Sequence, residues 1–416
     1  MDDKGYIEDI CLKAKAASRT VAKLASVDKN NILLSIASLL RDSKEAIKNG
    51  NMKDIDSAKA EGLSAAMIDR LFLDDKRIDA IASSVEEIAA YEDCVGRVEN
   101  MKVRPSGIRV GQMRIPIGVV AVIFESRPNV TIDIAALCIK SGNSCVLRGG
   151  KEAFNSNMAL YGIVKKALND FGYPENIVTF VERTGRELVP LLLKQNKFID
   201  VVIPRGGEGL IRMVTEESTI PVLKHDKGLC HIFIDESADE AMANKITINA
   251  KVQRPGVCNA AEALLIHQKY PHKESLLSAL LEQGVELRGC PETVKILPQR
   301  IVPASAADWD TEYLELIMSV KIVGDINEAV KHIESHGSGH SEAIVTRDYF
   351  NSEFFLRDVD SAAVFVNAST RFHDGGEFGL GAEVGISTEK LHARGAMGAE
   401  GLTTLKYIVY GQGEVR

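Results

Sequence analysis

The stretch Ile117-Gly-Val-Val-Ala-Val-Ile-Phe124 decides the fold class. It is a continuous apolar run rich in valine and isoleucine, which is typical of a strand buried on both faces of a parallel sheet. A polar turn, Glu125-Ser-Arg-Pro-Asn129, follows the run, and an amphipathic helix is predicted near Thr131–Lys140. A strand, a turn and a helix in this order indicate the start of a βαβ unit.

The same alternation continues on the carboxyl side of this unit. Further strands are predicted at Cys145–Leu147, Ile177–Val181, Asp200–Ile203, Pro221–Leu223 and His231–Ile234. Helices are predicted between them near Asn157–Asn169, Arg186–Lys194 and Gly209–Thr215. Strands that alternate with such helices predict an α/β protein with a doubly wound parallel sheet and right-handed crossovers. A second α/β stretch spans roughly Ala260–Val366.

Two other segments flank this core. Apolar residues at helical spacing in Ile32–Leu40 and Ile78–Ile88 predict helices in the first hundred residues, which would pack on something larger. The segment Val98–Arg114 contains two short strand-like runs around Pro105-Ser-Gly107, so we predict a protruding hairpin there.

Composition limits the classes of protein. The 416 residues suggest two or three domains, and 50 Lys and Arg against 58 Asp and Glu argue against a protein that coats nucleic acid. Apolar residues at 45% of the chain and charged residues at 26% together exclude intrinsic disorder. The longest apolar run is far shorter than the ~20 residues of a membrane span. The polar N-terminus and seven cysteines without a CxxC pair lead us to expect a cytoplasmic protein with reduced thiols and no membrane association.

Ligands of such folds bind beyond the carboxyl ends of the parallel strands. That rule selects Glu125–Asn129, Arg148–Lys151 and Pro204–Gly209. The glycines of Pro204-Arg-Gly-Gly-Glu-Gly209 would let backbone N–H groups approach a phosphate, although a plain strand-to-helix turn explains them equally well. Arg148 and Lys151 would suit a ribose or a 2′-phosphate, and a solvated loop is the alternative.

One cysteine stands apart from the others. Cys258 lies in a Pro- and Gly-shaped break between a helix and a strand, and the nearby Arg254 would favour its thiolate, so it is a candidate nucleophile. A structural turn is the other interpretation. His332, His336 and His340 fall four apart, but Gly337-Ser-Gly339 breaks the helix before the third, and we predict no metal site.

Several longer stretches together identify a family. They are Ile115–Val130, Lys140-Ser-Gly-Asn143, Leu147-Arg-Gly-Gly-Lys-Glu152, Gln253-Arg-Pro-Gly-Val-Cys-Asn-Ala-Ala-Glu262, Val323–Ile344, Asn367-Ala-Ser-Thr-Arg-Phe372 and Glu377-Phe-Gly-Leu-Gly381. Over nearly its whole length the chain resembles the gamma-glutamyl phosphate reductases, the proline-biosynthesis branch of the aldehyde dehydrogenase superfamily. Arg394-Gly-Ala-Met-Gly398 departs from the pattern, with Ala396 where proline is expected in a turn.

The resemblance implies a reaction and its catalytic residues. NADPH would reduce L-glutamyl 5-phosphate to L-glutamate 5-semialdehyde, the second step of proline biosynthesis from glutamate. Cys258 would be the nucleophile that forms a thioester, and Asn129 would supply the side-chain donor of the oxyanion hole. Hydrolytic relatives carry a water-activating glutamate where this chain has His225, which suits an enzyme whose acyl partner is phosphate.

The resemblance also implies binding residues. Arg148 would bind a ribose of NADP(H) together with Gly149 and Lys151, while Gly206 and Gly207 would form the pyrophosphate turn. Glu312 would hold the nicotinamide ribose. For the substrate, the chemistry of cations and hydroxyls rather than a matched motif points to four further residues, namely Arg127, Ser369, Thr370 and Arg371.

The implied organisation has an NADP-binding domain (1–97 and 115–228), a catalytic domain (229–391) and an oligomerisation arm (98–114 and 402–416). We therefore expect two doubly wound parallel-sheet domains with a small β arm, a homodimer or higher homo-oligomer, and possible coupling to glutamate 5-kinase. Two alternatives remain open. One is another acyl-phosphate- or acyl-CoA-linked aldehyde dehydrogenase, and the other is a non-catalytic nucleotide-binding subunit.

Overall fold

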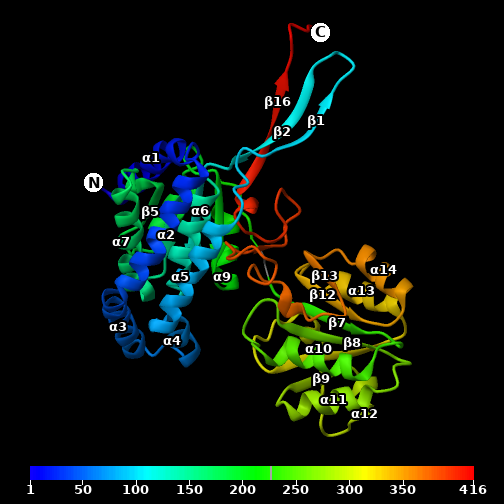
Figure 1. The fold of residues 1–416 in the computed structure, drawn as a ribbon. Helices are drawn as coiled ribbons and strands as arrows, with labels where there is room; N and C mark the ends of the chain where they lie inside the picture. The colour runs from blue at the N-terminus through cyan, green and yellow to red at the C-terminus, as the bar shows by residue number, and fades with distance from the viewer. Residues whose placement is uncertain (225–226) are drawn as a thin grey trace. The chain divides into compact units, whose positions relative to one another are not determined.

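The chain folds into two compact units, shown in a computed structural model that describes residues 1–224 and 227–416, with residues 65 and 66 described by their backbone alone (Figure 1). The first unit comprises Met1–Lys224, Gly379–Gly385 and Met397–Arg416. The second comprises His225–Phe378 and Ile386–Ala396. Each unit is an α/β structure around a parallel sheet, which confirms the predicted fold class.

The first unit is built on a four-stranded parallel sheet in the order β5-β4-β3-β6. Its strands are β3 (Val119–Phe124), β4 (Ser144–Gly149), β5 (Val178–Phe180) and β6 (Val201–Arg205). Every residue of β3 is buried, as its apolar run predicts. Since β3 lies between β4 and β6, the loops that follow these strands emerge at one edge of the sheet.

Nine helices surround this sheet among the described residues of the first unit. They are α1 (Asp3–Val21), α2 (Ser26–Asp42), α3 (Lys44–Ala60), α4 (Ala65–Leu71), α5 (Asp75–Ala90), α6 (Asn129–Lys140), α7 (Phe154–Asp170), α8 (Leu188–Leu193) and α9 (Glu208–Glu217). The apolar residues that predicted the early helices are buried in α2 and α5, so these helices pack inward as expected. Helix α6 begins two residues earlier than its amphipathic pattern, at Asn129.

A separate antiparallel sheet forms an arm, in the order β1-β2-β16 (Figure 1). Strands β1 (Val98–Val103) and β2 (Arg109–Pro116) make the predicted hairpin, and β16 (Thr403–Tyr410) pairs with β2 along its whole length. Large apolar side chains remain exposed on it, including Val103 at 70% and Tyr407 at 72%. The C-terminal strand and the hairpin therefore form one element, although some 290 residues separate them in the sequence.

The second unit has a seven-stranded parallel sheet in the order β10-β9-β11-β8-β7-β12-β13. Its strands are β7 (Cys230–Ile234), β8 (Ala261–His267), β9 (Glu286–Gly289), β10 (Val302–Pro303), β11 (Ile317–Val323), β12 (Ser341–Val345) and β13 (Ala363–Val366), with a separate pair β14 (Ile386–Ser387) and β15 (Gly395–Ala396). Its helices are α10 (Glu240–Val252), α11 (Lys273–Glu282), α12 (Pro291–Ile296), α13 (Ile326–His336) and α14 (Tyr349–Asp358).

The prediction of a strand at Pro221–Leu223 is wrong. This segment makes only an isolated bridge, between Val222 and Val202. Pro221 has no N–H to donate, so the ladder beside β6 cannot extend through it. Among the described helices, none combines the length and apolar character required to cross a membrane.

Candidate active site

Cys258 lies in the turn between α10 and β8 of the second unit. It is half-buried, whereas the other six cysteines are buried. Its carbonyl oxygen accepts a hydrogen bond from the Sγ of Cys230 at 3.2 Å, and burial raises the pKa of that Cys230 thiol, which keeps it a donor. The partial exposure of Cys258 agrees with a thiol that must be reached by a substrate.

Gly228 packs backbone against backbone on Cys258. A Cβ added at Gly228 would lie 2.0 Å from the carbonyl oxygen of Cys258 and 2.4 Å from its Cα. No real side chain tolerates that approach, and backbone atoms cannot rotate aside as the end of a flexible side chain can. Glycine at this position therefore allows the segment before β7 to support the cysteine turn.

Glu312 joins the same cluster. Its Oε1 accepts a hydrogen bond from the N–H of Gly228 at 3.0 Å. The structure therefore brings the predicted nicotinamide-ribose residue to the segment that supports Cys258. His225, predicted at the position of the water-activating glutamate, lies outside the described residues.

The segment Ser369–His373 is joined to the cysteine turn by three hydrogen bonds. The Thr370 hydroxyl donates to the carbonyl oxygen of Asn259 at 2.8 Å, and the Asn259 Nδ2 donates to the carbonyl of His373 at 3.0 Å. The Arg371 Nε donates to the Gln253 side chain at 2.9 Å. Both ends of the Gln253–Asn259 loop are thus fixed to the segment that follows β13.

These contacts distinguish the predicted substrate residues from one another. Thr370 is fully buried and its hydroxyl proton is engaged by Asn259, while Ser369 is 3% exposed and accepts the N–H of Arg371. Arg371 is half-buried and interacts electrostatically with Cys258. Burial and the neighbouring Arg254 lower the pKa of Arg371, which remains a cation at neutral pH. Among Ser369, Thr370 and Arg371, it is therefore Arg371 that brings a charge close enough to act on Cys258.

A buried ion pair lies next to the cysteine turn. The Lys251 Nζ is 2.7 Å from Oε2 of Glu262, and both side chains are at most 1% exposed. The other Glu262 oxygen accepts the N–H of Leu314 at 3.3 Å. Burial raises the pKa of Glu262 to about 7 against the opposing effect of Lys251. The pair connects α10, β8 and the loop that carries Glu312.

Replacing Lys251 by methionine is expected to lower the free energy of unfolding by about 3 kcal/mol, because Glu262 is left buried without its cation. The Lys251→Met/Glu262→Gln double variant is expected to recover a large part of that loss, since no charge remains unpaired. Urea unfolding of the three proteins measures both effects. A double variant less stable than the single one would contradict this interpretation.

In the first unit, the predicted binding loops contact one another at the edge where the parallel strands end. The Glu152 side chain accepts hydrogen bonds from the N–H and hydroxyl of Ser126, at 2.7 and 2.9 Å. The N–H of Gly207 donates to Oε2 of Glu125 at 3.0 Å. The three loops selected by the strand-end rule therefore do meet.

Glu125 occupies the predicted pyrophosphate turn. A Cβ at Gly206 would lie 2.4 Å from its carboxylate, and Gly207 is the N-cap residue of α9. The helix N-terminus favours negative charge, and here the Glu125 carboxylate provides it. A phosphate bound at this turn would have to take the Gly207 N–H from Glu125.

Arg148 is buried at the end of β4. Its guanidinium donates to the carbonyl oxygens of Gly149, Thr184 and Gly185, at 2.9 to 3.3 Å. Burial lowers the pKa of Arg148, and its Nε has no hydrogen-bond partner among the described residues. Lys151 instead forms an exposed ion pair with Glu61 at 3.1 Å. The Nε of Arg148 is therefore a buried donor without a partner among the described residues, and Lys151 is exposed to solvent.

Asn129 is the first residue of α6, directly after Pro128. Its Nδ2 donates to Oδ2 of Asp133 one turn later, at 2.8 Å. Arg127, a predicted substrate residue, is half-buried in the turn before the helix. The predicted oxyanion donor thus begins a helix in the first unit.

Sequence reasoning assigned no role to three residues of these clusters. Asp133, Gly228 and Glu262 all contact predicted site residues or their loops. Asp133 could have been found, because residues four apart share one face of a helix. The others depend on contacts between distant segments.

Comparisons with known proteins identify the family of the chain. Residues 2–289 match the model of the aldehyde dehydrogenase family. The gamma-glutamyl phosphate reductase of Carboxydothermus hydrogenoformans is 52% identical over 410 residues, which cover 98% of this chain and 99% of that protein. The crystal structure of the Thermotoga maritima gamma-glutamyl phosphate reductase superposes with a TM-score of 0.95 at 44% identity and covers 99% of both chains.

A more distant structure shows the same fold. The glyceraldehyde-3-phosphate dehydrogenase GapN of Methanocaldococcus jannaschii, solved in complex with NADP, gives a TM-score of 0.72 at 15% identity, over 98% of this chain and 95% of that one. The resemblance stated from the motifs is confirmed by the full-length relatives. The chain belongs to the aldehyde dehydrogenase family and, within it, to the gamma-glutamyl phosphate reductases.

Proposed function

We propose that this chain reduces L-glutamyl 5-phosphate to L-glutamate 5-semialdehyde with NADPH, and that the reaction passes through a thioester on Cys258. This is the second step of proline biosynthesis from glutamate, and the full-length relatives carry the name of that enzyme. The observation that carries the assignment of Cys258 is its half-buried thiol in a turn fixed by Gly228, Asn259 and Arg371.

Cys258 acts as the nucleophile. Its thiolate attacks the acyl carbon of the substrate, the bond from that carbon to the phosphate oxygen breaks, and inorganic phosphate leaves with the electron pair. Phosphate is a good leaving group and requires little protonation. Arg371 supports this step electrostatically, because a nearby cation favours both the thiolate and the anionic substrate.

Asn129 stabilises the oxyanion that forms on the acyl oxygen. Its side-chain N–H groups are donors, and the backbone N–H of Cys258 is the second donor in this mechanism. The oxyanion forms twice, once when the thioester is made and once when it is reduced. Loss of one such donor typically lowers the rate by 100-fold or more, on the order of 3 kcal/mol.

A nicotinamide cofactor serves this family, and NADPH is the form we propose. The residues present fit a dinucleotide with phosphate groups, since Arg148 has a buried Nε without a partner among the described residues and a phosphate could replace the Glu125 carboxylate as the acceptor of the Gly207 N–H at the start of α9. Arg148, Gly149, Lys151, Gly206 and Gly207 would hold its phosphates and adenosine ribose.

On the nicotinamide side, Glu312 would hold the ribose. Bound NADPH supplies the hydride that reduces the thioester carbon. Collapse of the resulting thiohemiacetal breaks the C–S bond, releases the aldehyde and returns Cys258 as a thiolate.

Arg127 and Arg371 are the cations that we assign to the carboxylate and phosphate of the substrate. Ser369 and Thr370 support them in this proposal by fixing the segment that carries Arg371, because their hydroxyls are engaged within the protein.

The test uses the reverse reaction, in which L-glutamate 5-semialdehyde, phosphate and NADP⁺ are the substrates. NADP⁺ reduction is expected to depend on phosphate, because the thioester needs phosphate as its acceptor. Absorbance of the nicotinamide measures the rate with and without phosphate, and with coenzyme A in its place.

Equal rates without phosphate would contradict the phosphate-linked mechanism and indicate hydrolysis. Activity with coenzyme A alone would favour an acyl-CoA-linked dehydrogenase. A protein that binds NADPH but shows no turnover under any of these conditions would be the non-catalytic subunit. The same assay with NAD⁺ tests the proposed preference for NADP.

We also propose that the chain acts as a homo-oligomer through the β1-β2-β16 arm. Its exposed apolar side chains and open strand edges would be covered by a second copy of the chain. The seven cysteines, which form no disulfide in the described residues, support a cytoplasmic location. Coupling to glutamate 5-kinase is a further part of the proposal.

A further inference from the structure

Asn129 and Asp133 form a side-chain pair on the first turns of α6. The Nδ2 of Asn129 lies 2.8 Å from Oδ2 of Asp133. Asparagine near a helix N-terminus often turns its side chain back to accept a backbone N–H. Here the Asn129 amide instead donates along the helix to the residue four positions later, so its orientation is set by Asp133.

A carboxylate fixes which end of the amide it faces. Ionised Asp133 has only acceptor oxygens, so it binds the Asn129 nitrogen and repels its oxygen. The amide nitrogen carries two hydrogens, and Asp133 takes one of them. The second remains for an oxyanion, and a charge-assisted bond on the first holds the nitrogen more firmly than a neutral bond.

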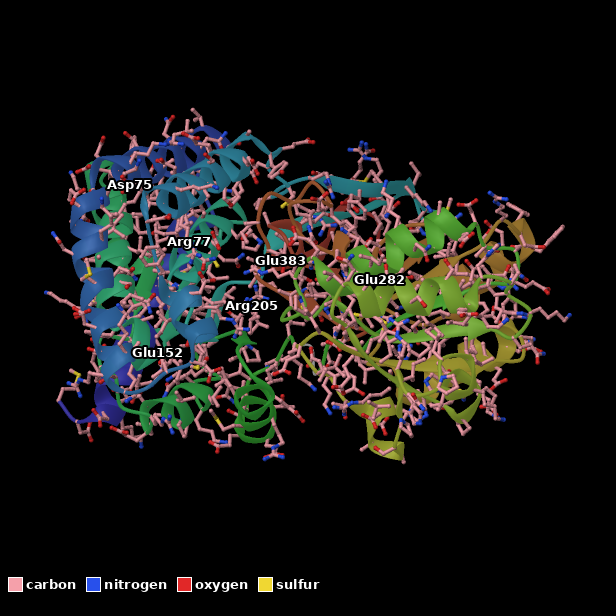
Figure 2. The ribbon with its side chains drawn as sticks, turned by 90° about the horizontal axis from the view of Figure 1, so that it is seen from below. Asp75, Arg77, Glu152, Arg205, Glu282 and Glu383 are labelled. Atoms are coloured by element: carbon pink, nitrogen blue, oxygen red, sulfur yellow. The ribbon has the colours of Figure 1, made fainter. Side chains whose placement is uncertain are left out.

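Charged groups from two other segments act on Asp133. Arg205, at the end of β6, favours its ionised form, while Glu383, in the Gly379–Gly385 segment, opposes it. Arg205 and Glu383 themselves lie side by side, with 3.8 Å between Nη2 and Oε1 (Figure 2). Gly385 packs on this arginine, since a Cβ there would lie 3.3 Å from its Nη1. Charges from two segments outside α6 therefore act on the Asp133 carboxylate.

Burial raises the pKa of Asp133 to about 6, with Asn129 and Arg205 acting in the opposite direction. The ionised form therefore predominates at neutral pH and is lost as the pH falls through about 6. A protonated carboxyl group can donate as well as accept, so it no longer distinguishes the nitrogen of Asn129 from its oxygen.

We propose that Asp133 is a positioning residue, which orients the Asn129 amide so that its second N–H is available to the oxyanion of the reaction. The inference rests on the proposed function, in which Asn129 is the oxyanion donor. Asp133 itself touches neither substrate nor cofactor in this role.

The first test is Asp133→Asn in the full-length enzyme, measured in the reverse reaction. An asparagine at 133 keeps the size but can bind either end of the Asn129 amide. We expect kcat to fall about 10-fold, part of the effect of losing an oxyanion donor, with unchanged KM for NADP⁺. The parent rate should also decrease below pH of about 6, and the variant should lack that decrease.

The conservative variant Asp133→Glu provides a second measurement. It retains a carboxylate, so its kcat is expected to lie between those of Asp133→Asn and the parent enzyme. Its rate should again fall at acidic pH, as the parent rate does. A merely structural role of Asp133 would lower stability without changing the shape of the pH profile. A parent-like kcat and pH profile in Asp133→Asn would overturn the inference.

The double-mutant cycle with Asn129→Ala separates this inference from the proposed function. If Asp133 acts through Asn129, Asp133→Asn changes the rate of the Asn129→Ala enzyme by less than twofold. An equal loss in both backgrounds would overturn the inference while leaving Asn129 as oxyanion donor. Parent-like activity of Asn129→Ala would reject the role of Asn129 and the inference together.

Discussion

Replacing Cys258 by alanine is expected to abolish NADPH-dependent reduction and leave NADPH binding unchanged. The thiolate forms the covalent link to the substrate, and removal of a nucleophile typically costs 10⁴-fold or more in kcat. No other cysteine can take its place, because the remaining six are buried. Enzyme assays in both directions and fluorescence titration with NADPH measure the two properties.

Cys290→Ala is the matched control. Cys290 lies in the same unit, is buried, and its Sγ is 3.2 Å from the hydroxyl of Thr293. This variant should keep its activity and lose about 1 kcal/mol of stability. Residual turnover by Cys258→Ala above one per cent of the parent rate would reject the nucleophile assignment and with it the thioester.

The parallel sheets could be predicted because a strand buried on both faces leaves a distinctive sequence. The run Ile117–Phe124 becomes β3 in the centre of its sheet, and its loops contact those of β4 and β6 as the strand-end rule predicts. Pro221–Leu223 has the same apolar character, yet its proline prevents a ladder. An apolar run therefore predicts that a segment is buried, whereas its backbone N–H groups decide whether the segment can pair with a neighbouring strand.

The cysteine turn could be located from the sequence, but the residues that hold it could not. Pro255 and Gly256 mark a turn by their own conformational preferences. Gly228 and Glu312 support the turn through contacts between segments that are distant in the sequence. The sequence alone does not distinguish a glycine that makes such a contact from one that does not. Thr370 was predicted from its hydroxyl, and only the structure shows that Asn259 engages it.

The second large effect is expected at Gly228. In Gly228→Ala the new methyl group would lie 2.0 Å from the carbonyl oxygen of Cys258, so one of the two backbones must move by about an ångström. Displacements of that size in a catalytic group lower rates on the order of 100-fold. We expect kcat to fall by this factor, with a loss of stability of about 1 to 3 kcal/mol from overpacking.

Gly162→Ala is the control for the substitution itself. Gly162 lies inside α7, and a Cβ there meets no atom within 4 Å. Alanine is the better helix former, so this variant should gain about 0.5 to 1 kcal/mol of stability and keep its activity. The two variants therefore make the same substitution, but Gly228→Ala is expected to lose stability and Gly162→Ala to gain it.

The rate at which iodoacetamide alkylates Cys258 reports the geometry of the turn independently of turnover. In Gly228→Ala this rate should change together with kcat, because both depend on where the sulfur is held. The alkylation rate of the Cys258→Ala protein measures the reaction of the other thiols and is subtracted. If Gly228→Ala kept the parent kcat and the parent alkylation rate, the contact between Gly228 and Cys258 would have no part in positioning the nucleophile. The N–H of Gly228 also donates to Glu312. A change in KM for NADP⁺ alone would therefore mean that Gly228 supports cofactor binding through Glu312 and does not position Cys258.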